Sequence, residues 1–248
     1  MRGVGRARTN WPQDNPKGAP WDPSKITPEI WFDSRVGATV VSNAVSAWTN
    51  RGTGPNVSQA TALLRPAYSA SDSIEAGAPV VIGDGISQYL GAVSTLNTPG
   101  TGYTVMVRGH WLGSAPASYA AIIWLGSGTA NGFLGRQGAP GIAGVNRNES
   151  AGFVVDTGST PDTTNSHTYE LHADYTAGTA VYMVDGVQQG STGSYTGGAG
   201  TPLARLFYLF NYTSGYAANF AMRSIVARNV AMTAPQRALL RTYLAGLK

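Results

Sequence analysis

The densest group of potentially reactive side chains lies in the segment ELHAD, residues 170–174. In an extended strand Glu170, His172 and Asp174 share one face and follow one another about 7 Å apart. Such a face could ligate a metal ion or contact a sugar, or it could be the solvated outer face of a strand whose other face enters the core. We favour the solvated face. His167 lies an odd number of residues from His172, so the two rings point to opposite faces and cannot chelate one ion together.

No other pattern of catalytic residues stands out. The sequence has no cysteine, no G-x-S-x-G elbow, no phosphate-binding loop and no His-x-x-x-His pair. These absences remove the usual signatures of thiol and serine nucleophiles, nucleotide hydrolysis and zinc sites. Asp84 and Asp185 precede glycines, where a role in a turn is sufficient, so calcium is left open without support. We therefore predict a protein that is not an enzyme and holds no cofactor or metal.

A sugar site would need an aromatic platform beside polar hydrogen-bonding groups. Aromatic residues between positions 103 and 125 fit a hydrophobic core better than a platform, and we favour the core interpretation. The candidate glycan contacts are Arg108, His110, Tyr119, Trp124, Glu170, His172 and Asp174.

The elements that position these residues are expected to be short β-strands. The 248 residues include 32 Gly and 14 Pro, and only 12% are charged, which is typical of extended segments joined by turns. The clearest β-like runs span residues 38–48, 78–82, 103–112, 119–125, 151–155, 167–175, 179–184, 204–210 and 219–228. Their spacing predicts an all-β antiparallel sandwich.

Residues alternate between two faces along the run 103–112. One face carries Tyr103, Val105, Val107 and Trp111, and the other carries Thr104, Met106, Arg108 and His110. By contrast the runs 119–125 and 205–210 are apolar on both faces, as expected of central strands that a second layer covers.

Two local sequence patterns predict a turn and a helix in the last third of the chain. The pair Asp185-Gly186 between two valines predicts a two-residue type I′ turn, which needs positive φ at both central positions. Thr233, Pro235 and Gln236 form a capping-box signature for a short helix. Its apolar stripe is Leu240, Tyr243, Leu244 and Leu247.

Residues 1–28 contain five prolines and two tryptophans without a helical or alternating pattern. We predict an extended anchoring arm here, followed by a sandwich domain over residues 29–248. Two tryptophans are costly to leave in water, so we expect them to dock on the protein's own body or on a partner. The predicted anchoring residues are Arg2, Arg6, Arg8, Trp11 and Trp21.

Charge is unevenly distributed along the chain. The net charge is +4, and residues 186–248 carry six basic residues and no acidic one. This asymmetry fits ends that meet acidic neighbours, although solvated arginines would explain it equally well. Nucleic acid is not expected as the partner, because the basic residues are scattered and no recognition module is present.

No signal-peptide or membrane-spanning pattern is present, so we expect no secretion by the general route and no membrane partner.

Several stretches together resemble the concanavalin A-like lectin/glucanase superfamily in its laminin-G-like form. They are HTYELHADYTAGTAVYMVDGVQQG (167–190), APVVIGDGISQYLGA (78–92) and FAMRSIVARNVAMTAPQRALLRTYLAG (220–246). The stretch VSAWTNRGTGPNVSQATALLRPAY (45–68) is similar to the start of such domains in tailed-bacteriophage virion proteins. The resemblance implies a jelly roll of two curved antiparallel sheets. Enzymes of the superfamily use an E-x-D-x-(x)-E strand, which this sequence lacks.

On this basis we predict a non-enzymatic structural protein of a tailed-phage virion. It would be a capsid decoration or head-fibre protein at the virion surface, held by its arm to other virion proteins and self-associated as a homo-oligomer. The alternative is a carbohydrate-binding module of a phage tail or baseplate that holds host surface glycans. The same fold serves both, so the fold alone does not choose between them.

Overall fold

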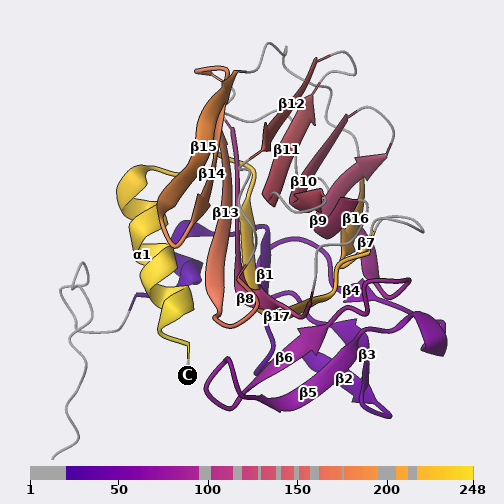
Figure 1. Ribbon diagram of the computed structural model, residues 1–248. Helices are drawn as coiled ribbons and strands as arrows, with labels where there is room; N and C mark the ends of the chain where they lie inside the picture. The colour runs from indigo at the N-terminus through magenta and orange to yellow at the C-terminus, as the bar shows by residue number, and fades with distance from the viewer. Residues whose placement is uncertain are drawn as a thin grey trace, which may run out of the picture.

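The computed structural model describes residues 21–94, 102–113, 119–127, 130–137, 141–147, 151–156, 162–174, 176–194, 205–211 and 217–247. Over these ranges the protein is an antiparallel β-sandwich with one C-terminal α-helix, as the sequence predicts (Figure 1). Arg2, Arg6, Arg8 and Trp11 of the predicted arm lie outside the described residues.

The first sheet is built around β17 (Phe220–Arg228), which pairs with β8 (Gly102–Trp111). Beyond β8 follow β13 (His167–Asp174), β14 (Thr179–Val184) and β15 (Val187–Ser194). Two strands share the other edge of β17, namely β1 (Ile30–Asp33) and β6 (Ala78–Ile82).

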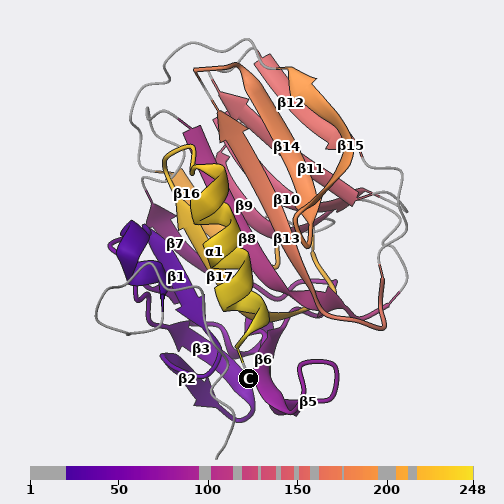
Figure 2. The same ribbon diagram turned by 90° about the vertical axis from the view of Figure 1, so that its left-hand side faces the viewer.

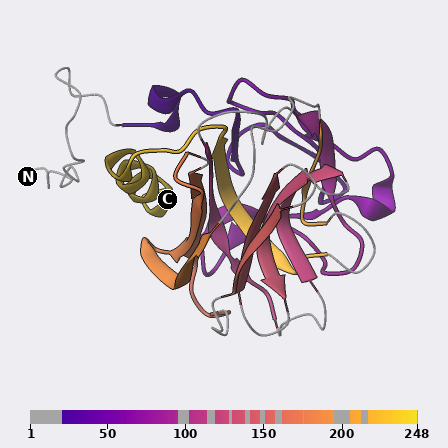
Figure 3. The ribbon, with the colours of Figure 1, turned by 90° about the horizontal axis from the view of Figure 1, so that it is seen from above.

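The second sheet runs in the order β7, β16, β9, β10, β11 and β12. These strands are β7 (Leu90–Ser94), β16 (Arg205–Leu209), β9 (Tyr119–Ser127), β10 (Ala130–Gln137), β11 (Gly141–Arg147) and β12 (Ala151–Asp156). Seen from above, the two sheets face one another (Figure 3).

Four short strands join the two sheets along one side. They are β2 (Ala38–Val41), β3 (Ala44–Trp48), β4 (Val57–Ser58) and β5 (Ala67–Asp72). β5 pairs with β6 of the first sheet, while β4 pairs with β7 of the second. The hydrogen-bonded ladder is therefore continuous from one layer to the other.

The main core lies between the sheets and follows the predicted alternation. On β8, Tyr103, Val105 and Val107 point inward and are at most 1% exposed, while Phe207 and Leu209 of β16 meet them from the second sheet. Each fully buried side chain of this kind stabilises the fold by about 1.5–3 kcal/mol relative to exposure. This alternation leaves Thr104, Met106 and Arg108 on the outer face of the first sheet.

The helix α1 (Ala234–Ala245) covers that outer face (Figure 2). It begins with the predicted capping box, in which Thr233 and Gln236 exchange hydrogen bonds. Leu240 and Leu244 then pack on Met106 of β8 in a second, smaller core. No helix among the described residues has both the length and the apolar character that a membrane crossing needs.

The end of the predicted arm is packed against this helix rather than extended. Residues Pro23–Ile26 form a short 3-10 helix, η1, that is capped by the side chain of Asp22. The ring of Trp21 contacts that of Tyr243 edge-on, with centroids 6.1 Å apart. Trp21 thus docks on the protein's own body, one of the two placements that the sequence left open.

Two sequence predictions need correction in detail. The run 38–48 is not one strand but the hairpin β2–β3, because Ser42 and Asn43 both adopt positive φ, 52° and 61°. The strands β10 and β11 were not predicted, because glycines interrupt their apolar pattern. A further 3-10 turn, η2 (Ala62–Leu64), precedes β5.

Candidate functional site

An aromatic strip lies on the outer face of the second sheet, the sheet that α1 does not cover. We use this name for Tyr89, Tyr208 and Trp124, whose side chains are all partly exposed. Tyr208 of β16 is paired directly with Trp124 of β9. The ring of Tyr89, just before β7, meets Tyr208 edge-on with centroids 5.4 Å apart. The three residues therefore follow one another across β7, β16 and β9, which lie at the right of Figure 1.

Strand alternation puts these rings outside. Ile123 beside Trp124, and Phe207 and Leu209 on either side of Tyr208, are fully buried in the main core. The residues between them must then point to the opposite face. Gly91 of β7 lies under Tyr208, and a Cβ there would be 3.0 Å from two carbons of the ring. The absence of a side chain lets the tyrosine ring lie close over the neighbouring strand.

A polar pocket lies on the opposite side of the molecule, between the β14–β15 hairpin and α1. We call it the helix pocket, and its volume is about 470 Å³. It is open to solvent, with β8 and β13 supplying its floor. The lining residues are Arg108, Thr168, Asp185, Ala238, Arg241, Thr242 and Ala245.

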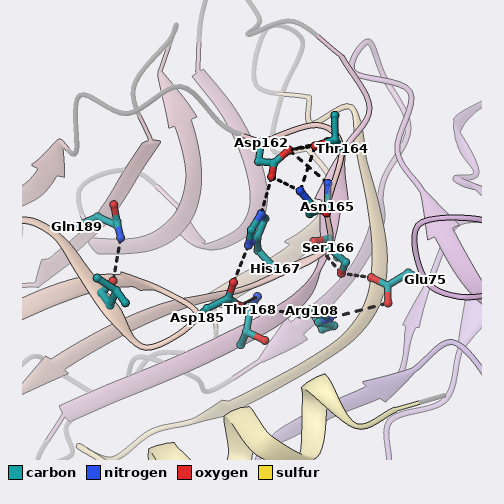
Figure 4. A network of polar contacts seen from close by, with 12 residues as sticks. Glu75, Arg108, Asp162, Thr164, Asn165, Ser166, His167, Thr168, Asp185 and Gln189 are labelled. Atoms are coloured by element: carbon teal, nitrogen blue, oxygen red, sulfur yellow. Dashed lines mark hydrogen bonds and ion pairs between the residues drawn. The ribbon is translucent and has the colours of Figure 1, made fainter.

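The hairpin tip places Asp185 beside the pocket. Asp185 and Gly186 have φ of 51° and 83°, as the predicted type I′ turn requires, and Val184 pairs with Val187. The carboxylate does more than support the turn. One oxygen accepts a hydrogen bond from the backbone N–H of Thr168 at 2.8 Å, and the other lies 2.6 Å from Nδ1 of His167 (Figure 4).

His167 thus connects two acidic side chains. Its Nε2 lies 3.2 Å from Asp162, whose carboxylate also accepts hydrogen bonds from Asn165 and Thr164 (Figure 4). These hydrogen bonds lower the pKa of Asp162 below its usual value. The chain Asp162–His167–Asp185 ties the start of β13 to the hairpin tip and so holds the rim of the helix pocket.

Beneath α1 the structure corrects the interpretation of the ELHAD face. Glu170, His172 and Asp174 do point outward, but the helix covers this face and the Glu170 side chain is fully buried. Its carboxylate pairs with Arg241 at 2.6 Å and with Arg237 at 3.2 Å. Burial raises the pKa of Glu170, and the two arginines act in the opposite direction. Glu170 is therefore a structural anchor for α1 and is closed to any glycan.

The neighbours of Glu170 on this face are similarly engaged. Nδ1 of His172 lies 3.0 Å from the Thr104 hydroxyl, which itself donates to the carbonyl of Val230 and accepts from the N–H of Met232. This leaves the hydroxyl oxygen as an acceptor for His172, so the imidazole donates from Nδ1. Burial, and then the charge of Arg237, lowers its pKa to about 4.

The other candidate glycan contacts are dispersed. Asp174 accepts hydrogen bonds from the backbone of the turn that follows it. His110 is fully buried, 3.6 Å from Asp72, and cannot reach a ligand. Arg108 lines the helix pocket, whereas Trp124 belongs to the aromatic strip on the other sheet. The side chain of Tyr119 lies outside the described residues.

The sequence reasoning missed three contributors. Tyr208 lies in a run that is apolar on both faces, so the pattern does not distinguish it from core residues. Its hydroxyl group is the one feature that indicates an outward position. Tyr89 lay in a motif used only to identify the fold. Arg241 lies outside the apolar stripe of the predicted helix, and the structure places its side chain over the hairpin tip. No group of three metal-ligating side chains was found within the part of the chain that the structure describes.

No protein-family model matches the sequence, and no curated protein does. Solved structures do resemble the fold. A sialidase of Trypanosoma rangeli has a TM-score of 0.60 at 14% identity, over 95% of this chain and 36% of the sialidase. The chain thus spans about a third of that enzyme.

Two further neighbours are smaller. Domain 4 of AbnA, a GH43 extracellular arabinanase from Geobacillus stearothermophilus, solved with arabinotriose, has a TM-score of 0.55 at 12% identity, over 88% of this chain and 98% of the domain. The binding domain of botulinum neurotoxin serotype D/C has a TM-score of 0.56 at 9% identity, over 88% of this chain and 52% of the other. At these identities the likeness establishes the β-sandwich fold.

Proposed function

We propose that this protein is a non-catalytic carbohydrate-binding domain that holds an extended glycan across the aromatic strip. The observation that carries the proposal is the row of three partly exposed rings on the outer face of the second sheet. Sugar rings have apolar C–H faces that stack on aromatic side chains, and neighbouring strands about 4.8 Å apart present such rings in series.

The fold is compatible with this role. The arabinanase domain covers nearly the same length as this chain and was solved with arabinotriose, and the toxin neighbour is itself a binding domain. Neither has a sequence close enough to transfer a ligand. The arabinanase domain supports the proposal as a sandwich of this fold that was solved, as a separate domain, in complex with an oligosaccharide.

The helix-covered face does not favour catalysis. Glu170, the most deeply buried acid of the ELHAD segment, is paired with two arginines and has no access to solvent. Asp162 and Asp185 are both engaged with His167. The sequence also lacks the E-x-D-x-(x)-E pattern, and on the described part of this face no pair of free carboxylates is evident for glycoside hydrolysis.

The structural role at a virion surface, with virion partners and self-association, stays a prediction. The three neighbours described above include no bacteriophage protein, and they favour the glycan-binding alternative. A domain displayed on a virion that binds host glycans would combine the structural role with the glycan-binding role. The partner that we propose is the host glycan.

The test is a glycan array followed by calorimetric titration of the strongest neutral oligosaccharide. A sugar ring that covers about 60 Å² of an aromatic face contributes about 1.5 kcal/mol at 25 cal/mol per Å². Trp124→Ala and Tyr208→Ala should therefore each weaken binding by roughly tenfold. Val187→Ala, which removes an exposed apolar side chain from the other sheet, is the matched control and should bind normally. An array without any neutral ligand, or unchanged affinity in both aromatic variants, refutes the proposal.

A further inference from the structure

The helix pocket presents two arginines on a concave surface that the aromatic strip does not use. Arg108 stands on β8 and Arg241 on α1, with the hairpin tip between them. A Cβ at Gly186 would be 2.8 Å from Nε of Arg241, so the guanidinium lies directly over this glycine. The pocket exists in this form because the hairpin turn has no side chain at that position.

The acids around the pocket are already satisfied. Both oxygens of Asp185 are within hydrogen-bond distance of His167 or the Thr168 backbone. Glu170 is held by Arg237 and Arg241, so these three groups together carry a net charge of +1. Arg108 itself is flanked by the carboxylates of Glu75 and Asp185. An incoming carboxylate at Arg108 would therefore compete only with the two long ion pairs that Arg108 makes with Glu75 and Asp185, each 3.9 Å.

Arg108 has donors to spare. Its two ion pairs, with Glu75 and with Asp185, are both 3.9 Å long, which exceeds a hydrogen bond. Among the described residues its guanidinium makes no shorter polar contact, and its side chain is 17% exposed. A guanidinium has five N–H groups in a planar fork that matches the two oxygens of a carboxylate. Arg108 is thus arranged to receive a carboxylate from solvent.

The other residues that line the pocket restrict which kinds of ligand can bind there. Asp185 has about half of its side chain exposed and would accept hydrogen bonds from hydroxyl groups. Its negative charge would repel a doubly charged phosphate more strongly than a singly charged carboxylate. The Thr242 hydroxyl is a second polar group on the helix, and the methyl groups of Ala238 and Ala245 offer an apolar wall. A volume of about 470 Å³ is within the usual range for small-ligand sites.

We propose that the helix pocket binds a sugar residue that carries a carboxylate, with the carboxylate on Arg108 and the ring hydroxyls near Asp185 and Thr242. This inference deepens the proposed function and rests on it, because it adds a second subsite for acidic residues of a glycan. The aromatic strip and the helix pocket lie on different sheets, so the two subsites can be tested separately.

The test uses the full chain with glucuronic acid and N-acetylneuraminic acid as probes and their methyl esters as uncharged matches. The acids should bind in the millimolar range at low salt, and the esters at least tenfold more weakly. Arg108→Gln should abolish binding of the acids, and Arg108→Lys should restore only part of it because an ammonium lacks the planar fork. Lys25→Gln, which removes an exposed positive charge on η1, is the control and should not change binding.

Two further measurements keep the proposal falsifiable. Ala245→Trp fills the pocket from the exposed helix surface while Arg108 itself is kept, and it should also block the acids. Trp124→Ala should leave acid binding intact while it weakens the neutral oligosaccharide. Equal binding of acids and esters, sulfate binding as tight as that of the acids, or retained binding in both Arg108→Gln and Ala245→Trp overturns the proposal. A wild-type protein that binds the acids but no neutral oligosaccharide would count against the aromatic strip instead.

Discussion

Replacing His172 should change how the stability of the fold depends on pH. In the folded state burial and Arg237 lower the pKa of this histidine to about 4, whereas an unfolded histidine titrates near 6.5. The unfolded chain therefore binds more protons between these two values. Stability contributed by the neutral ring is fully present above pH 6.5 and is lost as the pH falls through 4.

The magnitude follows from the difference between the two pKa values. Each pKa unit corresponds to about 1.36 kcal/mol, so the full effect approaches about 3 kcal/mol between pH 7 and pH 4. His172→Asn is the informative variant, because the amide nitrogen can replace Nδ1 as donor to Thr104 but does not titrate. At pH 7 it should cost about 1 kcal/mol. At pH 4 the variant should be more stable to unfolding than the wild type.

The assay is urea unfolding of both proteins at half-unit steps from pH 7 to pH 4, together with titration of the histidine resonances by NMR. The sequence has only three histidines, so each resonance can be assigned by substitution. Burial also lowers the pKa of His110, so the difference between wild type and variant, rather than either curve alone, isolates His172. A difference that stays constant with pH, or a measured pKa near 6.5 for His172, would refute the reasoning.

Three other substitutions test the scaffold by thermal and chemical denaturation. Gly186→Ala should cost about 2 kcal/mol, because φ is 83° and the new Cβ would displace Arg241; Gly190→Ala, at φ 67° but away from the helix, should cost less. Thr233→Ala removes the capping box of α1 and should cost about 1 kcal/mol, while the exposed Thr39→Ala should be neutral. Trp21→Ala removes the edge-on contact with Tyr243 and should cost about 1–2 kcal/mol, and an unchanged midpoint would show that this end of the arm is not docked.

Local chemistry made several elements predictable. The Asp185-Gly186 turn and the Thr233 capping box depend on residues within four positions of one another, so the sequence alone specifies them. The alternation along β8 is likewise predictable, because successive side chains of a strand point to opposite faces and the apolar ones face the core. The hairpin at Ser42-Asn43 was missed because neither residue is glycine, the usual marker of positive φ.

The candidate sites depended on contacts between distant parts of the chain. The outward direction of Glu170 was predictable, but its burial was not, because α1 returns to cover it from about 70 residues further along the chain. Tyr89, Tyr208 and Trp124 become one surface only through the pairing of β7, β16 and β9.

The sequence by itself thus determined where the chain turns, which residues alternate and where the last helix begins, since these depend on neighbouring residues. Only the tertiary structure decided which outer face is covered and which is open. That choice is set by the hydrophobic stripe of one helix, which can bury itself on only one of the two sheets. Because the helix lies on the first sheet, Glu170 is buried as an anchor for the helix. The aromatic strip and the helix pocket are the surfaces at which we propose ligand binding.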